Sequence, residues 1–126
     1  MKRVYVCGSF RFTREIQELE RMLKKENIKH QTTNTNNNHG ILGCLKRIDD
    51  SDIIYIVNPG GYVGNSVCID VGYAHAKNKP IYVLHPLEDA PLMKLVRDTL
   101  SFEELINLLK QPEATMRAER SRHARS

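Results

Sequence analysis

The sequence lacks several features that would assign it to a special class. It has no apolar run near the ~20 residues that cross a membrane as a helix, so we expect no membrane partner. Met1-Lys-Arg is followed by a strand-like run too short for the apolar part of a signal peptide, so none is expected. There is no internal repeat and no sign of a second domain. The 126 residues suit one domain with an ordinary hydrophobic core.

Cysteine is scarce, and its positions exclude two further classes. Cys7, Cys44 and Cys68 are odd in number, which argues against a disulfide framework, and they lack the spacing of metal ligands. We expect buried free thiols in a reducing, cytoplasmic compartment. The acidic residues at 49–52 precede a strand and are interpreted as a solvated helix end. The sequence therefore predicts neither a metal site nor a cofactor.

Positive charge is concentrated at one end of the chain. The formal net charge is +4, and residues 110–126 carry five basic and two acidic side chains, a net of +3. The remaining chain is nearly neutral. Aromatic residues do not interleave with this basic run, so residues 111–126 are interpreted as a solvated tail and not as a nucleic-acid contact.

Hydrophobic periodicity predicts alternating strands and helices. Apolar runs predict strands at 3–7, 28–33, 53–57 and 80–84, and helical spacing predicts helices at 13–26, 41–49, 67–79 and 102–109, with a helical turn at 91–97. Residues 34–40 have turn composition and are expected to form a loop. This order predicts an α/β fold, a single-domain three-layer sandwich with a parallel sheet of four to five strands, Rossmann-like or flavodoxin-like.

In such sheets ligands bind outside the carboxyl ends of the strands. Three loops are expected to converge there, at 8–13, 58–66 and 85–90. The loop at 58–66 is rich in glycine, and Gly61 and Gly64 let a ligand approach the backbone closely. Asn65 or Ser66 is expected to cap the helix that follows, whose N-terminus suits an anion.

Two stretches in these loops leave alternatives open. The turn Gly8-Ser9-Phe10-Arg11 could hold a phosphate or sugar, or could be an ordinary turn with a solvated arginine. Asp70 could be a structural carboxylate bonded to backbone N–H groups, or a nucleophile or general base. His85, in the third loop, could contact a ligand or only pack.

The chain resembles the nucleoside 2-deoxyribosyltransferase family, including its branch of deoxynucleoside 5′-monophosphate N-glycosidases. Tyr5-Val-Cys-Gly-Ser-Phe-Arg11 is similar to the first-strand motif of the hydrolase branch. The segment at 61–74 is similar to the family's second motif, a glycine and serine turn followed by acid-x-Gly-x-Ala. The resemblance covers roughly residues 3–109, so residues 1–110 are expected to form the family's domain, followed by the tail at 111–126.

The resemblance implies a role for each site residue. Asp70 would attack the anomeric carbon, Tyr5 would orient its carboxylate, Ser9 and Arg11 would hold the sugar or 5′-phosphate, and Ser66 would contribute to phosphate binding. The loop residues Gly8, Phe10, Gly61, Gly64, Asn65 and His85 would complete the substrate pocket. A homodimer or higher homo-oligomer is implied, because sites of this family usually draw on a neighbouring subunit.

Two positions depart from the family's pattern. The family acid is a glutamate, and Asp70 is shorter by one C–C bond, about 1.5 Å. Cys44 stands where the family tends to carry an acid that recognises the base. The resemblance nevertheless implies cleavage or transfer of the N-glycosidic bond of a 2′-deoxyribonucleoside or its 5′-monophosphate, through a covalent intermediate on Asp70. The alternative is a non-catalytic nucleotide-binding protein on the same fold, and a nucleic-acid binder is the third possibility.

Overall fold

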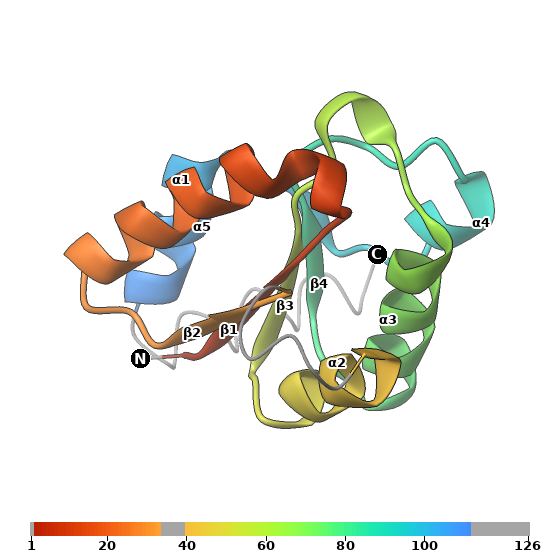
Figure 1. Ribbon diagram of the computed structural model, residues 1–126, viewed down its shortest axis with the longest axis horizontal. Helices are drawn as coiled ribbons and strands as arrows, with labels where there is room; N and C mark the ends of the chain where they lie inside the picture. The colour runs from red at the N-terminus through yellow and green to blue at the C-terminus, as the bar shows by residue number, and fades with distance from the viewer. Residues whose placement is uncertain (1, 34–39, 112–126) are drawn as a thin grey trace.

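The computed structural model describes residues 2–33 and 40–111, which form one α/β unit (Figure 1). Five parallel strands make a single sheet in the order β2-β1-β3-β4-β5. The strands are β1 (Val4–Cys7), β2 (His30–Thr32), β3 (Ile53–Ile56), β4 (Ile81–Val83) and β5 (Asp98–Thr99). The helices are α1 (Thr13–Lys25), α2 (Gly40–Asp49), α3 (Asn65–Ala76), α4 (Ala90–Met93) and α5 (Phe102–Lys110), with short 3-10 turns η1 (Phe10–Phe12) and η3 (Pro59–Gly61).

The strand order places a topological switch point between β1 and β3. From β1 the chain moves outward to β2, whereas from β3 it moves the other way to β4 and β5. This is the flavodoxin-like order, in which ligands bind in the crevice at the switch point. The predicted three-layer sandwich and its parallel sheet are confirmed.

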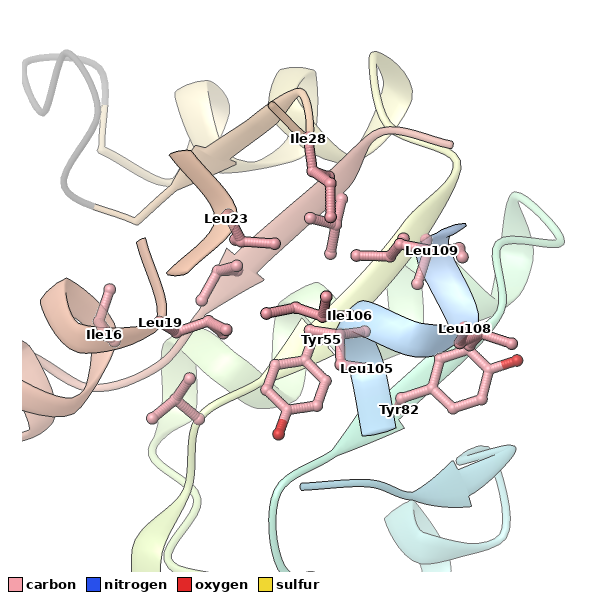
Figure 2. Packing of buried hydrophobic residues seen from close by; sticks show 14 residues of the cluster. Ile16, Leu19, Leu23, Ile28, Tyr55, Tyr82, Leu105, Ile106, Leu108 and Leu109 are labelled. Carbon is pink, nitrogen blue, oxygen red and sulfur yellow. The ribbon is translucent and has the colours of Figure 1, made fainter. Parts of the chain in front are cut away.

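The two faces of the sheet bury separate apolar clusters. Figure 1 shows α1 and α5 on one face and α2 and α3 on the other. Side chains alternate along β1, so Val4 and Val6 pack beneath α1 and α5, whereas Tyr5 and Cys7 pack beneath α2 and α3. Figure 2 shows the first cluster, in which leucines and isoleucines of α1 and α5 meet Tyr55 and Tyr82 from the strands.

The outer helices follow the signals in their sequences. α1 buries Ile16, Leu19 and Leu23, and the chain leaves it at Asn27, whose φ of 56° is left-handed and suits asparagine. The predicted capping box of α5 is present. Ser101 Oγ accepts from the Glu104 N–H at 3.1 Å, and Glu104 Oε1 accepts from the Ser101 N–H at 2.9 Å.

Some local predictions were wrong. A helix forms at 40–49, but Ile41 and Leu42 are exposed, because the side of α2 that packs on the sheet is centred on Ile48. α3 begins at Asn65 with Gly64 as its N-cap, so neither Asn65 nor Ser66 caps it. The two-residue strand β5 was not predicted, because it is too short to show periodicity.

Several predictions lie outside the described residues. These are most of the loop at 34–40 and the tail from residue 112 onward. Within the part of the chain that the structure describes, no helix has the length and apolar character needed to cross a membrane.

Candidate active site

A cavity of about 390 Å³ opens at the switch point, beside the carboxyl ends of β1 and β3. We call it the pocket. Its walls come from the turn after β1, the segment that follows β2, one face of α2, the loop that leads into α3 and the first turns of α3. The lining residues are Gly8, Ser9, Phe10, Thr33, Gly40, Ile41, Cys44, Arg47, Tyr62, Gly64, Asn65, Ser66, Val67 and Asp70. The expected convergence of the first two loops is therefore present.

The floor of the pocket depends on a close approach between two strand ends. Gly8 follows β1, and a Cβ at this position would stand 2.7 Å from the Val57 carbonyl oxygen. Only glycine lets the backbones lie this close. The Gly8 N–H donates to Thr33 Oγ1 at 3.2 Å, which ties the end of β2 to the same turn.

Asp70 is a carboxylate in a helical stripe that is otherwise apolar. α3 buries Val67, Asp70, Val71 and Ala74, which follow the i, i+3, i+4, i+7 spacing of a helix face turned to the core. Asp70 is only 4% exposed and lines the pocket. The side chain therefore meets the interior of the protein on one side and the pocket on the other.

Burial and a neighbouring arginine act on Asp70 in opposite directions. Loss of hydration disfavours the charged carboxylate and raises its pKa to about 7, while the positive charge of Arg47 lowers it. Arg47 comes from α2, lines the same pocket and is 7% exposed. At neutral pH Asp70 is therefore poised between its two protonation states.

Tyr5 lies beneath Asp70 in the sheet. The ring is fully buried, and its hydroxyl makes no well-formed hydrogen bond to any described residue. The Cys44 thiol, a weak partner, lies beside it. Burial raises the pKa of Tyr5 first, and the nearby Cys7 and Asp70 charges raise it further, so the phenol is neutral and can donate a proton in a hydrogen bond.

The N-terminus of the helix that carries Asp70 presents backbone donors to the pocket. α3 has Gly64 as its N-cap, which makes no side-chain capping bond. The first bond within the helix runs from the Cys68 N–H to the Gly64 carbonyl at 3.1 Å. No hydrogen bond within the helix uses the N–H groups of Asn65, Ser66 and Val67, and such a helix end favours an anion.

Aromatic side chains form the rim of the pocket. Phe10 is 67% exposed although it lines the pocket, and Tyr62 lines it from the loop after β3. The Arg11 guanidinium lies over the Tyr62 ring at 4.2 Å, and Phe12 meets that ring edge-on at 5.9 Å between centroids. The rim combines flat apolar surface with a cation held at its edge.

Four of the predicted site residues do not line the pocket. Tyr5 lies beneath its wall and Arg11 behind its rim. A Cβ at Gly61 would stand 2.6 Å from the Pro86 carbonyl oxygen, so this glycine joins two loops. His85 Nδ1 accepts from the Gly60 N–H at 3.0 Å, which places its proton on Nε2 and gives it a structural contact. Their proposed contacts with substrate stay predictions.

The sequence reasoning missed several lining residues. Thr33, Arg47 and Tyr62 were not singled out, and Cys44 was considered only as a departure from the family pattern. A signal for Arg47 existed, because Cys44 and Arg47 are three residues apart and share a helix face. Among the described residues, no three His, Cys, Asp or Glu side chains gather closely enough to hold a metal ion.

Solved structures share this architecture. A 2-deoxyribosyltransferase from Bacillus psychrosaccharolyticus matches with a TM-score of 0.69 and 13% identity, over 90% of this chain and 94% of its own. A conserved protein from Enterococcus faecalis V583 matches with a TM-score of 0.65 and 17% identity, over 88% and 98%. A CMP N-glycosidase from Clostridium botulinum matches with a TM-score of 0.54 and 16% identity, over 86% and 98%.

Sequence comparison adds no closer relative. No protein-family model matches the chain, and no curated protein matches it. At sequence identities this low, the structural matches show a shared fold and nothing more. The reaction has to be argued from the residues of the pocket.

Proposed function

We propose that the protein cleaves or transfers the N-glycosidic bond of a 2′-deoxyribonucleoside or its 5′-monophosphate through a covalent glycosyl intermediate on Asp70. The observation that carries the proposal is the placement of Asp70, a buried carboxylate that lines a cavity about one turn along the same helix from an N-terminus that also lines it. The fold is shared with a deoxyribosyltransferase and an N-glycosidase, which supports the same class of reaction.

The chemistry needs one carboxylate as nucleophile. An Asp70 oxygen attacks the anomeric carbon, and the bond from that carbon to the base breaks with its electron pair left on the base nitrogen, which takes up a proton from water. A water molecule or the nitrogen of a second base then attacks the same carbon and loses a proton to water. The bond from that carbon to the Asp70 oxygen breaks, its electron pair returns to the carboxylate, and the free sugar or a new nucleoside is released. This double displacement is the logic of retaining glycosidases.

The surroundings of Asp70 suit this role. Burial strips water from the carboxylate, and a pKa of about 7 leaves a substantial ionised fraction at neutral pH. Tyr5 supplies a neutral hydroxyl without a strong partner, which can donate to one carboxylate oxygen and aim the other at the sugar. The shorter side chain of aspartate still reaches the cavity wall.

The helix N-terminus gives the substrate its orientation. Backbone N–H groups of residues 65–67, with the hydroxyls of Ser9 and Ser66, form a cradle for a 5′-phosphate or 5′-hydroxyl. Phe10 and Tyr62 offer flat surfaces at the rim where a base can stack. The two motifs Gly8-Ser9 and Asn65-Ser66 favour the monophosphate over the nucleoside.

A nucleotide-binding protein without turnover is the second candidate. One observation favours it: a pKa of about 7 leaves a large part of Asp70 protonated at neutral pH, and the protonated form is not a nucleophile. The anion cradle and the rim would bind a nucleotide equally well in that case.

Free base is the product that separates the two candidates. The protein is incubated with each deoxynucleoside and each deoxynucleoside 5′-monophosphate, and the mixtures are separated by chromatography. The proposal expects base from at least one substrate, and faster from the monophosphate. Measurable nucleotide binding with no base from any substrate would establish the non-catalytic candidate. A second base added to the mixture tells transfer from hydrolysis, because a new nucleoside then forms.

We also propose a homo-oligomer of at least two copies in the cytoplasm. Leu42 is 78% exposed beside the pocket residue Ile41, and Ile69 on α3 is 43% exposed, which supports a covering partner at this side. The three cysteines are unpaired, with only Cys7 fully buried, as suits a reducing compartment. Sedimentation measures the first claim, and a monomer at all concentrations would contradict it.

A further inference from the structure

We propose that Arg47 is the positioning residue of the pocket: its buried guanidinium balances the charge of Asp70 and keeps that carboxylate in the form that attacks the sugar. No part of the family resemblance assigned a role to this residue. The catalytic consequence of this role rests on the proposed function, whereas the electrostatic pairing does not.

The geometry brings the two charged groups to one wall of one cavity. Arg47 is in the last turns of α2 and Asp70 is in the middle of α3, and these helices pack against each other. Both side chains are more than nine-tenths buried, and both line the pocket. Removing a guanidinium or a carboxylate from water costs free energy. Two opposite charges that are buried near one another offset part of that cost.

The other groups around Asp70 cannot supply that compensation. Cys7 and Tyr5 reach it from β1, and Cys44 comes from α2. These three become negative or stay neutral on titration, so none can offset a carboxylate. Burial and the Asp70 charge raise the pKa of the Cys7 thiol well above its usual range, so it is neutral. Among the described residues that line the pocket, Arg47 is the only cation.

Arg47 is also held in place. Its Nη1 donates to Cys44 Sγ at 3.6 Å, one helical turn earlier on the same face. Cys44 in turn lies beside the Tyr5 hydroxyl. Cys44 stands where the family pattern has an acid, so the side chain next to the arginine on this face is a thiol and not a carboxylate. An acid at that position would compete for the same guanidinium.

A role for Arg47 in holding the 5′-phosphate is the main alternative. The phosphate cradle is formed by the N-terminus of α3, whereas Arg47 is near the C-terminal end of α2. A phosphate ligand would change affinity for monophosphates and leave the ionisation of Asp70 unaltered. The two roles therefore predict different measurements.

The test is a direct titration of Asp70 by carbon NMR in protein labelled at the aspartate carboxyl carbon, with Asp70→Asn to identify the signal. Arg47→Met removes the charge and keeps much of the side-chain stem, and Arg47→Lys keeps the charge. Arg11→Met is the matched control, because Arg11 is a cation at the same pocket's rim but stacks on Tyr62.

The proposal expects the proton affinity of the Asp70 carboxylate to rise at least about tenfold in Arg47→Met. It should rise less in Arg47→Lys and stay unchanged in Arg11→Met. An unchanged midpoint in Arg47→Met, or an equal rise in Arg11→Met, overturns it.

If Arg47→Met does not fold, a double-mutant cycle on stability decides the question. The Arg47→Gln and Asp70→Asn variants, each of which removes one charge and keeps a polar side chain, and their double variant are unfolded by denaturant at about pH 5 and about pH 8. The coupling between the two sites should be larger at the higher pH, where Asp70 is ionised. Coupling that is zero or independent of pH contradicts the pairing.

Where the wild-type protein releases base, kinetics add a second readout. The acid limb of the pH profile of kcat/KM should move upward in Arg47→Met, with about a fivefold loss at neutral pH that recovers at alkaline pH. A rise in KM confined to monophosphates, with the profile unmoved, would establish the phosphate role instead. If no variant and no wild-type protein releases base, the proposed function fails while the titration still tests the pairing.

Discussion

Two buried tyrosines on neighbouring strands, one on each face of the sheet, differ in whether their hydroxyl groups are hydrogen-bonded. Tyr5 on β1 and Tyr55 on β3 are both fully buried, and Tyr55 is the residue paired with Val6, so the two rings point to opposite faces. The Tyr55 hydroxyl donates to the Leu100 carbonyl at 2.6 Å, and Figure 2 shows its ring among the leucines of α1 and α5. The Tyr5 hydroxyl makes no comparable bond within the described residues.

The difference separates the stabilising face from the reactive face. Beneath α1 and α5 the cluster is apolar and its tyrosine is satisfied. Beneath α2 and α3 the apolar cluster borders a buried carboxylate, a buried guanidinium and an unsatisfied hydroxyl, all beside the pocket. Burying charged groups and an unbonded hydroxyl costs stability, so their concentration at a cavity indicates a function.

The largest expected effect is on turnover when the carboxylate is removed. Asp70→Asn keeps the shape of the side chain and removes the carboxylate that we propose as the nucleophile, so base release should fall at least ~1000-fold. Chromatography of the released base measures it, and Asp49→Asn, an exposed acid outside the pocket, is the control. Turnover retained by Asp70→Asn would remove Asp70 as nucleophile.

The same variant should change how stability depends on pH. The pKa of Asp70 is raised to about 7 in the folded protein, so the folded state binds more protons than the unfolded state between about pH 4 and pH 7. The free energy of unfolding of the wild-type protein, compared with that of Asp70→Asn, should therefore fall by about 2–4 kcal/mol as the pH rises through this window. Denaturant unfolding at several pH values measures this. A constant difference between the two proteins would contradict the raised pKa.

Activity should distinguish the two tyrosines. Tyr5→Phe removes the hydroxyl that we propose orients the carboxylate of Asp70, and base release should fall by about 10–100-fold. Tyr55→Phe changes the closed face and should leave kcat and KM within about twofold. Equal losses in the two variants would mean that the faces are not functionally separate.

Stability should rank the same two variants in the opposite order. Tyr55→Phe leaves the Leu100 carbonyl without its donor and should cost about 1–2 kcal/mol of unfolding free energy. Tyr5→Phe removes a hydroxyl that is already unsatisfied, so its stability should be unchanged or slightly higher. Urea unfolding of both proteins checks this, and a larger loss in Tyr5→Phe would show that its hydroxyl is bonded after all.

The smallest expected effect is that of the basic tail. Truncation after Pro112 should leave nucleotide affinity unchanged, because the pocket is complete without those residues in the part of the chain that the structure describes. Calorimetry with a deoxynucleoside monophosphate measures it. A loss of affinity above about tenfold would assign the tail to binding.

Local sequence signals predicted most of the fold. The apolar run that became β3 and the capping box of α5 were both readable, since each depends on neighbours in the chain. Asp70 was also readable, because it occupies a position in the buried stripe of α3. The loop motifs brought Ser9, Gly64 and Ser66 to the pocket, as the strand order requires.

The remainder of the site depends on packing that no local pattern encodes. The rotation of α2 about its axis is fixed by its contact with α3, and that rotation exposes Leu42 and turns Arg47 inward. A strand that is buried on both faces shows no alternation of apolar and polar residues, so its sequence does not indicate which helices each tyrosine packs against. The contrast between Tyr5 and Tyr55 could therefore not be predicted. His85 was placed in the correct loop, but its ring is turned to the Gly60 N–H.

The most direct test of the central claim is the identity of the residue that carries the sugar during turnover. The protein is mixed with an active substrate, quenched in acid within a single turnover, digested and measured by mass spectrometry. The account predicts a deoxyribosyl or phosphodeoxyribosyl ester on the peptide that contains Asp70, decaying as base exchange or hydrolysis completes and absent from Asp70→Asn. Sugar bound to a different residue, or undiminished base release by Asp70→Asn, would contradict it.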